Sequence, residues 1–319
     1  MTPQAKRGGI DLGGTKIQAV IVDADNAVLG DGRRPTPTAG GPEAVTREMA
    51  DTLADACAAA GIAPDGLAGV GVGSPGAIDP AAGTVANAGN LPDWREAFPL
   101  VDRLSSAVGA PVRLGNDVSV ATAAEFELGA GREWSSLVGV FWGTGVGGGI
   151  VLDDRPWEGR GSAGEIGHVV VKKDGRRCPC GRRGCMEAYA GRGAMEARAR
   201  KLHHEDGRHT DLFEIMKSRG RDRLTSGIWS RALDHGDRLA TEIVDEAVDA
   251  LGNGVASVIN VLDVEGVVIG GGLGLKLGRP YADRIAESMQ PHLFVAPPVI
   301  EVAALGDLGG AIGAALLAR

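Results

Sequence analysis

Two short apolar segments separated by a glycine turn stand near the start of the chain. Ile10 and Ile17 to Val22 are rich in β-branched residues, and the intervening Asp11-Leu12-Gly13-Gly14-Thr15-Lys16 shows no helical period. This pattern predicts a β-hairpin, not a strand-to-helix turn. The segment Val138 to Val151 repeats the order of apolar strand, Gly/Thr turn and apolar strand. The repetition predicts that the chain contains two similar halves facing one cleft.

Helical periodicity alternates with short buried strands along the rest of the chain. Apolar residues recur every three to four positions in Glu43 to Ala60 and in Asp237 to Leu262, so both segments are expected to be helices. Each is followed by a short apolar strand, Leu67 to Gly73 after the first and Val267 to Ile269 after the second. The alternation predicts an α/β architecture.

Composition and charge narrow the class of protein. The 319 residues are 44% apolar, which is enough for a full core and, at about 150 residues per domain, for two domains. The formal net charge is −8 and no block of basic residues occurs, so a nucleic-acid partner is not expected. The polar segment from Lys201 to Arg223 carries charges of both signs and is expected to form a solvated helical excursion.

Neither a secretory signal nor a membrane span is predicted. Met1 to Gly9 is short and polar, and Asp11 interrupts any apolar stretch that would follow it. Ser135 to Leu152 is an uncharged stretch of 18 residues, but its six glycines make it a poor helix. We therefore expect a cytoplasmic protein without a membrane partner.

The glycine hairpins are candidates for binding phosphate. Backbone N–H groups in a glycine turn can approach phosphate oxygens closely, while a Thr hydroxyl and a Lys ammonium add a donor and a positive charge. A tight hairpin without a ligand explains Gly13 to Lys16 equally well when that turn is taken alone. The second turn at Gly143-Thr144-Gly145 weakens this alternative. Neither turn has the Gly-x-x-x-x-Gly-Lys-Ser/Thr spacing or opens a helix, so a P-loop NTPase and a Rossmann dehydrogenase fit poorly.

Three cysteines within eight residues form the strongest local signal. His168, Cys178, Cys180 and Cys185 supply one imidazole and three thiolates, which complete a tetrahedral zinc shell. The alternatives are a chance cysteine cluster or a redox pair. A complete shell leaves no open position for a catalytic water, so the pattern predicts a structural zinc ion and argues against a zinc hydrolase.

These segments together resemble the ROK family of bacterial sugar kinases and repressors, and the resemblance runs from about Gly9 to the C-terminal helix. It rests on five motifs of this sequence: Asp11-Leu-Gly-Gly-Thr-Lys16, Gly115-Asn-Asp117, Gly143-Thr-Gly145, Glu165-Ile-Gly-His168 and Cys178-Pro-Cys-Gly-Arg-Arg-Gly-Cys-Met-Glu187.

The resemblance implies the fold and the domain limits. The fold would be a two-domain α/β fold of the actin-like ATPase (RNase H-like) class with the active site in the interdomain cleft. Residues 1–117 and 300–319 would form a small α/β domain that includes the C-terminal helix Gly309 to Leu317. Residues 118–299 would form a large α/β domain that carries the zinc-binding loop.

The same resemblance implies that Asp117 is the catalytic base. Asp117 follows the strand-like Val112 to Leu114 and precedes a predicted helix, Val118 to Leu128, so that the sequence alone also allows a helix N-cap. As a base, it would accept the proton of a sugar hydroxyl that attacks the γ-phosphorus of ATP. Asp11 is our candidate for holding Mg²⁺. The predicted nucleotide-binding residues are Asp11, Gly13, Gly14, Thr15, Lys16, Gly143, Thr144, Gly145, Gly270, Gly271 and Gly272, the last three being equally compatible with a plain turn.

Sugar recognition requires several convergent polar groups. The zinc ion would fix Glu165 and Glu187 on an otherwise mobile loop, and His168 would bind zinc through one ring nitrogen while the other meets a sugar hydroxyl. The residues that the resemblance assigns to the sugar are Gly76, Asn90, Asn116, Asp117, Glu165, His168 and Glu187.

The donor and the acceptor are inferred from details of the motifs. Only about nine residues precede the first strand, too few for the helix-turn-helix of the repressor members, which argues for a kinase. Polyphosphate-using relatives generally lack the cysteine motif, which favours ATP. Asn90-Leu-Pro-Asp-Trp94 resembles the loop of glucokinase members, so that glucose is expected first, then N-acetylglucosamine, N-acetylmannosamine or fructose. The alternative of another class is a non-catalytic sugar sensor, and a homodimer or homotetramer is a family expectation.

Overall fold

A computed structural model of the chain describes residues 5–89 and 91–319. By their internal contacts these residues fall into two compact units. Unit 1 consists of the residues up to Gly129 together with Glu158–Gly161 and Ala304–Arg319. Unit 2 consists of Ala130–Trp157 and Ser162–Ala303. Helix α3 (Asp117–Leu128) and the C-terminal helix α11 (Gly309–Leu316) are therefore both parts of unit 1.

Unit 1 is built on a five-stranded sheet with the order β3-β2-β1-β4-β7. The first two strands form the antiparallel hairpin that the sequence predicts, and β4 and β7 continue the sheet parallel to β1. The strands are β1 (Arg7–Leu12), β2 (Lys16–Val22), β3 (Val28–Pro35), β4 (Gly69–Ser74) and β7 (Val112–Asn116), with a separate small ribbon of β5 (Ala77–Asp79) and β6 (Thr84–Ala86).

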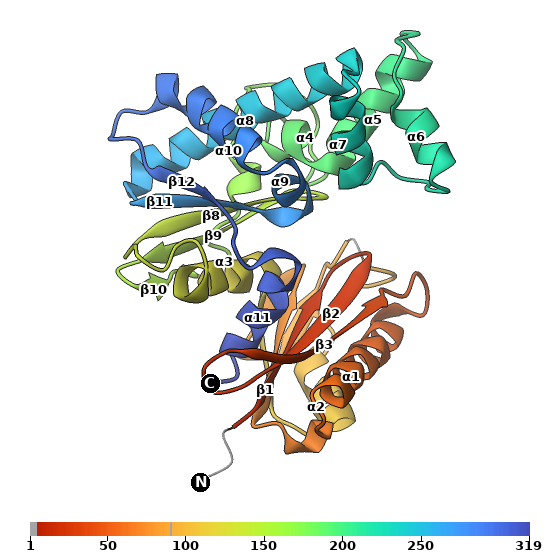
Figure 1. Ribbon diagram of the computed structural model, residues 1–319, viewed down its shortest axis with the longest axis vertical. Coiled ribbons are helices and arrows are strands. Elements are labelled where there is room, and N and C mark those ends of the chain that lie inside the picture. The colour runs from red at the N-terminus through yellow and green to blue at the C-terminus, as the bar shows by residue number, and fades with distance from the viewer. Residues whose placement is uncertain (1–4, 90) are drawn as a thin grey trace. The chain divides into compact units, whose positions relative to one another are not determined.

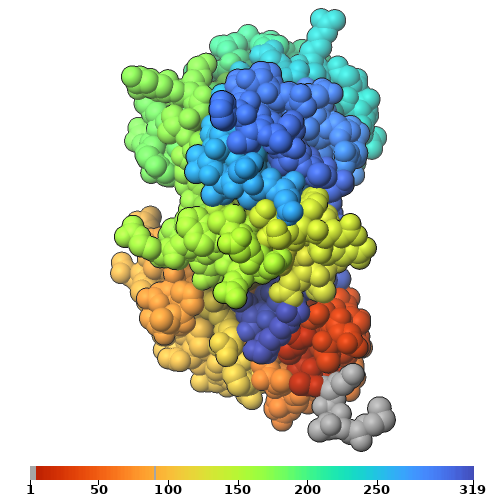
Figure 2. All heavy atoms as spheres, turned by 90° about the vertical axis from the view of Figure 1, so that its left-hand side faces the viewer, coloured from red at the N-terminus to blue at the C-terminus, as the bar shows by residue number. Residues whose placement is uncertain are grey.

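Alternate residues of β2 supply two different cores of unit 1, as the period of two in a strand requires. Ile21 packs toward α1 (Gly41–Ala59) and α2 (Leu100–Val108), whereas Val20 packs toward α3 and α11. A Cβ atom on Gly71 of β4 would collide with the backbone carbonyl of Ala314, so glycine there allows α11 to lie directly on the sheet. Figure 2 shows the C-terminal residues, in dark blue, seated against the red N-terminal strands of this unit.

Unit 2 repeats the strand arrangement of unit 1. Its sheet has the order β10-β9-β8-β11-β12, in which β8 and β9 form the second predicted hairpin and β11 and β12 run parallel to β8. The expectation of two similar halves is thus confirmed at the level of sheet topology. The strands are β8 (Leu137–Trp142), β9 (Val146–Leu152), β10 (Arg155–Pro156), β11 (Gly266–Gly270) and β12 (Val299–Val302).

The helices of unit 2 gather on one side of its sheet (Figure 1). The longest, α8 (Arg238–Leu262), begins at the N-cap Asp237, whose carboxylate accepts a hydrogen bond from Ala240 N at 2.8 Å. One large apolar core joins this helix to β8 and β11. The other helices of the unit are α4 (Glu187–Ala190), α5 (Arg192–His204), α6 (Leu212–Ser218), α7 (Ser226–Asp234), α9 (Gly271–Leu277) and α10 (Arg279–Met289).

The structure tests two predictions, the solvated segment 201–223 and the absence of a membrane-spanning helix. The segment 201–223 contains the end of α5 and all of α6, but Leu212 and Ile215 of α6 are buried in the core, so only part of this excursion is solvated. In residues 5–89 and 91–319, no helix has both the length and the apolar character that a bilayer crossing would require.

Candidate functional site

The turn between β1 and β2 is a compact, backbone-bonded loop. Gly13 N donates to Lys16 O at 3.0 Å, and the hydroxyl of Thr36 donates to Gly13 O at 2.6 Å. The backbone N–H of Thr36 also donates to Thr15 O at 3.3 Å. The buried Thr36, which follows β3, therefore holds the turn in place through these two hydrogen bonds. Thr36 could not be identified from the sequence, because a threonine that follows a strand carries no pattern of its own.

Asp11 lies at the end of β1, against the first turn of α11. A Cβ atom on Gly310 would stand only 2.8 Å from the carboxylate carbon of Asp11, so the helix can approach the carboxylate only because this position is glycine. Burial raises the pKa of Asp11 to about 6, with Lys16 opposing the shift and Asp307 adding to it. Lys16 donates to Gln18 Oε1 at 2.7 Å and lies 3.7 Å from Asp307. A half-buried carboxylate at the end of β1, next to the glycine turn, suits a group that holds a cation near phosphate.

Replacing Asp11 with Asn is expected to stabilise the fold at alkaline pH. Because the pKa is raised in the folded state from 3.8 to about 6, the unfolded chain releases this proton first as the pH rises. Stability is therefore lost across that window, and the loss is complete above pH 6. Asn cannot ionise, so we expect Asp11→Asn to raise the free energy of unfolding by about 1–3 kcal/mol at pH 8. Urea titrations at pH 5 and pH 8 check this, since the gain must be smaller at pH 5; an equal effect at both values would contradict it.

Asn116 and Asp117 stand where β7 passes into α3. Asn116 Oδ1 accepts from Val118 N at 3.0 Å and from Ser119 N at 3.1 Å, so Asn116 is the N-cap of the helix. The alternative that Asp117 is the N-cap is wrong. Asp117 is the first helical residue, and its Oδ1 accepts from Val118 N at 2.9 Å.

The topology of unit 1 brings several predicted site residues to one edge of its sheet. Strands β1, β4 and β7 are parallel neighbours, so the predicted residues Asp11 and Asn116 lie at their carboxyl ends, together with Ser74, which was not predicted. Open α/β sheets bind ligands at this edge. Gly76, also predicted to bind sugar, follows β4 with a positive φ of 100°. Asn90 lies outside the described residues.

In unit 2, the turn Gly143-Thr144-Gly145 is held by the start of α5. Arg192 N donates to Gly143 O at 3.1 Å, and Gly193 N donates to Thr144 O at 3.0 Å. The other predicted nucleotide motif is adjacent, because a Cβ atom on Gly143 would lie 4.0 Å from the backbone nitrogen of Gly272. Gly270 to Gly272 passes from β11 into α9. The structure therefore brings the two glycine motifs of this unit together.

Four potential metal ligands converge in unit 2. One donor atom from each of His168, Cys178, Cys180 and Cys185 lies within 4.8 Å of the others. Cys180 Sγ and Cys185 Sγ are 3.8 Å apart, as are Cys178 Sγ and His168 Nδ1. Zn–S bonds of about 2.3 Å in a tetrahedron require sulfur atoms separated by about 3.8 Å. The donor set and its spacing therefore fit a four-coordinate zinc ion.

The thiols of this cluster differ in acidity. Burial raises the pKa of Cys178 to about 12, whereas a hydrogen bond from the backbone of Arg182 lowers the pKa of Cys180 to about 6. Burial also raises the pKa of Cys185. Zinc binds thiolates, so loading the site would release protons, mainly from the two buried cysteines.

The predicted sugar-binding residues of unit 2 surround the cysteine cluster. His168 turns Nδ1 toward Cys178, and its Nε2 lies 3.7 Å from Glu165 Oε2. Glu187 bridges two features of the unit, because Oε1 lies 3.7 Å from Cys178 Sγ and Oε2 accepts from Val146 N at 3.0 Å. A Cβ atom on Gly145 would collide with this carboxylate. Glu187 thus links the cysteine cluster directly to the glycine turn, a connection that the sequence spacing does not reveal.

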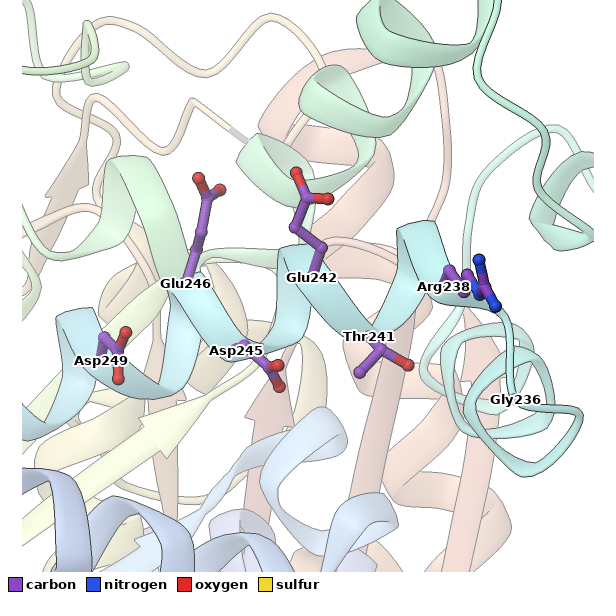
Figure 3. A pocket seen from close by; sticks show the side chains of 7 residues that line it. All are labelled: Gly236, Arg238, Thr241, Glu242, Asp245, Glu246 and Asp249. Carbon is purple, nitrogen blue, oxygen red and sulfur yellow. The ribbon is translucent and has the colours of Figure 1, made fainter.

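A groove along α8 holds none of the predicted site residues. It has a volume of about 580 Å³ and runs along α8 from Gly236 to Asp249. Figure 3 shows Glu242 and Glu246 on one side of this helix and Asp245 on another, so the acids do not converge. Each forms an ion pair with an arginine: Glu242 with Arg208, Asp245 with Arg284 and Glu246 with Arg176. We therefore interpret the groove as a solvated, charge-balanced surface.

The chain is similar to one family of known proteins. The model of the ROK family matches residues 7–319. The chain is 35% identical to a glucokinase of Thermotoga maritima and 32% identical to an N-acetylmannosamine kinase of Haemophilus influenzae. These alignments cover 97% and 96% of this chain and 97% and 93% of the relatives, respectively.

A solved structure supports the same grouping. The ROK family glucokinase from Streptomyces griseus, in complex with glucose and AMPPNP, is 31% identical and superposes with a TM-score of 0.85 over 99% of both chains. The expected α/β fold of the actin-like class is confirmed by this similarity.

Proposed function

Because the chain belongs to the ROK family, we propose that it is an ATP-dependent sugar kinase whose acceptor is glucose. The observation that carries the proposal is similarity over nearly the whole chain to glucokinases, one of them crystallised with glucose and the ATP analogue AMPPNP. The product would be glucose 6-phosphate.

In unit 1, Asp117 is the proposed catalytic base. Its carboxylate would take the proton of the glucose hydroxyl while that oxygen forms a bond to the γ-phosphorus and the bond from this phosphorus to the β–γ bridging oxygen breaks, so that ADP leaves. Asp11 would hold Mg²⁺ through water, and the ion would neutralise phosphate charge. The nearby turn from Gly13 to Lys16 would donate to the phosphates, and Gly76, Asn90 and Asn116 would contact the sugar.

In unit 2, the proposed roles divide between nucleotide and sugar. Gly143, Thr144 and Gly145, with Gly270 to Gly272, would contact the nucleotide through backbone and hydroxyl donors. Glu165, His168 and Glu187 would contact sugar hydroxyls. A zinc ion held by His168 and the three cysteines would act structurally by fixing these residues.

The cellular setting follows from the same chemistry. Three thiols that would serve as metal ligands must stay reduced, and ATP would be the donor, so we place the reaction in the cytoplasm. A homodimer or homotetramer stays a prediction from the family.

The acceptor is tested by a coupled ADP-release assay. Purified protein with ATP and Mg²⁺ is offered glucose, N-acetylglucosamine, N-acetylmannosamine, mannose and fructose in parallel. We expect kcat/KM for glucose to exceed that for each other sugar by at least about tenfold, because a mispaired buried hydroxyl or an extra acetyl group is penalised. A preference for N-acetylmannosamine, favoured by the Haemophilus influenzae relatives, would replace glucose as the acceptor. No turnover with any sugar would leave the non-catalytic sugar sensor.

A further inference from the structure

Arg192, the first residue of α5, is a half-buried cation with two hydroxyl partners. Its guanidinium donates to Thr144 Oγ1 at 3.0 Å and to Ser226 Oγ at 3.1 Å. Among the residues that the structure describes, no carboxylate forms an ion pair with Arg192. A partly desolvated charge without a counter-charge is unfavourable unless a ligand supplies one.

The acid nearest along the same helix is already engaged. Glu196 lies one turn beyond Arg192, and its Oε1 accepts from Arg200 at 2.7 Å. Its Oε2 accepts from Arg223 at 3.1 Å and from Leu224 N at 3.0 Å. Burial, with repulsion from Arg223, lowers the pKa of Arg192, and the more distant charge of Glu196 opposes this shift only weakly. The local structure thus directs the only acid of this helix turn away from Arg192 and leaves the guanidinium for another anion.

The two hydroxyls beside Arg192 add donors to the guanidinium, because their own hydrogens are free to point toward an outside acceptor. Each hydroxyl oxygen accepts from the guanidinium, and within the described structure neither Thr144 nor Ser226 donates its own hydrogen to a protein acceptor. A guanidinium with two O–H donors matches a ligand that carries only acceptors and negative charge, which is the chemistry of a phosphate.

The cluster lies beside both glycine motifs proposed for the nucleotide. Thr144 belongs to the glycine turn between β8 and β9, and a Cβ atom on Gly272 would lie 3.6 Å from Ser226 Oγ. Arg192 therefore connects the two glycine motifs proposed for the nucleotide. We propose that Arg192, together with Ser226, is a nucleotide-binding residue that contacts the polyphosphate of ATP; this inference rests on the proposed kinase function.

The test compares a ligand that has phosphates with one that has none. ADP and adenosine are titrated calorimetrically into the wild-type protein and into Arg192→Gln, Arg192→Lys and Ser226→Ala. We expect Arg192→Gln to weaken ADP binding by about 10- to 100-fold, the usual effect of losing a charged hydrogen bond, and adenosine binding by less than about twofold. Arg192→Lys keeps the charge and should recover part of the ADP affinity, and Ser226→Ala should lose about 3- to 10-fold for ADP alone. Lys201→Gln, an exposed cation on the same helix, is the charge-matched control and should bind both ligands normally.

The outcomes separate this inference from the kinase proposal. An equal loss of affinity for ADP and for adenosine would mean that Arg192 only stabilises the conformation of the turn. Unchanged ADP affinity in Arg192→Gln would mean that Arg192 is not part of the nucleotide site. Either result, with wild-type protein that phosphorylates a sugar, overturns the role of Arg192 and leaves the kinase intact. Wild-type protein that binds neither ligand would overturn both.

Discussion

Asp117→Asn is expected to lower the turnover number for sugar phosphorylation by about 10²- to 10⁴-fold, the range typical of a lost general base. The affinity for glucose should change by less than about threefold, because Asn keeps the shape and the acceptor oxygen that Val118 N needs. Turnover is measured by ADP release, and glucose affinity by calorimetry.

The control for this substitution is an acid in a similar place without a proposed role. Asp102 lies in the first turn of α2, also in unit 1, and is exposed. Asp102→Asn should leave turnover and glucose affinity unchanged. If Asp117→Asn lost sugar affinity and turnover in the same proportion, or lowered the melting temperature sharply, the carboxylate would be structural and its assignment as the base would be refuted.

Cys185→Ser is expected to abolish binding of the proposed zinc ion and to impair both the sugar-binding and the nucleotide-binding residues proposed in unit 2. Cys185 is fully buried, and hard serine oxygen is a poor replacement for thiolate. The bound zinc should fall from about one ion per chain to well below that value. Because Glu187 connects Cys178 to the backbone of Val146, kcat/KM should fall by about 10- to 100-fold for glucose and for ATP.

Zinc is counted by atomic emission on dialysed protein, alongside steady-state kinetics. Cys57 provides the matched control, since it is a buried cysteine in α1 of unit 1 and outside the cluster. Cys57→Ala should keep the full zinc content and the kinetic constants, whatever it costs in stability. Wild-type protein with clearly less than one zinc per chain and full activity would refute the metal assignment.

The elements of the fold were predictable because periodicity and glycine turns are local signals. Both hairpins, the helix after Gly41 and the long helix before β11 lie where the pattern of apolar residues indicates. The repeat of the hairpin predicted two similar halves, and the two sheets share one strand order because each hairpin starts a sheet to which parallel strands are added.

What the sequence could not supply were contacts made by single side chains across the fold. The N-cap of α3 was one such case, because Asn116 and Asp117 are both good capping residues and only the backbone angles decide between them. The bridge made by Glu187 and the hydroxyl partners of Arg192 join segments that are 34 to 48 residues apart in the chain. Residues 191–208 contain four arginines, at positions 192, 198, 200 and 208, and nothing in the spacing distinguishes Arg192 from the other three.

The kinase reaction itself is most directly tested by identifying its products. Purified protein is incubated with ATP, Mg²⁺ and ¹³C-labelled glucose, and the mixture is followed by ³¹P and ¹³C NMR. We predict that ADP and glucose 6-phosphate form in equal amounts and that ADP formation stops when glucose is omitted. Release of ADP and inorganic phosphate at the same rate without glucose, with no sugar phosphate formed, would contradict the proposed function.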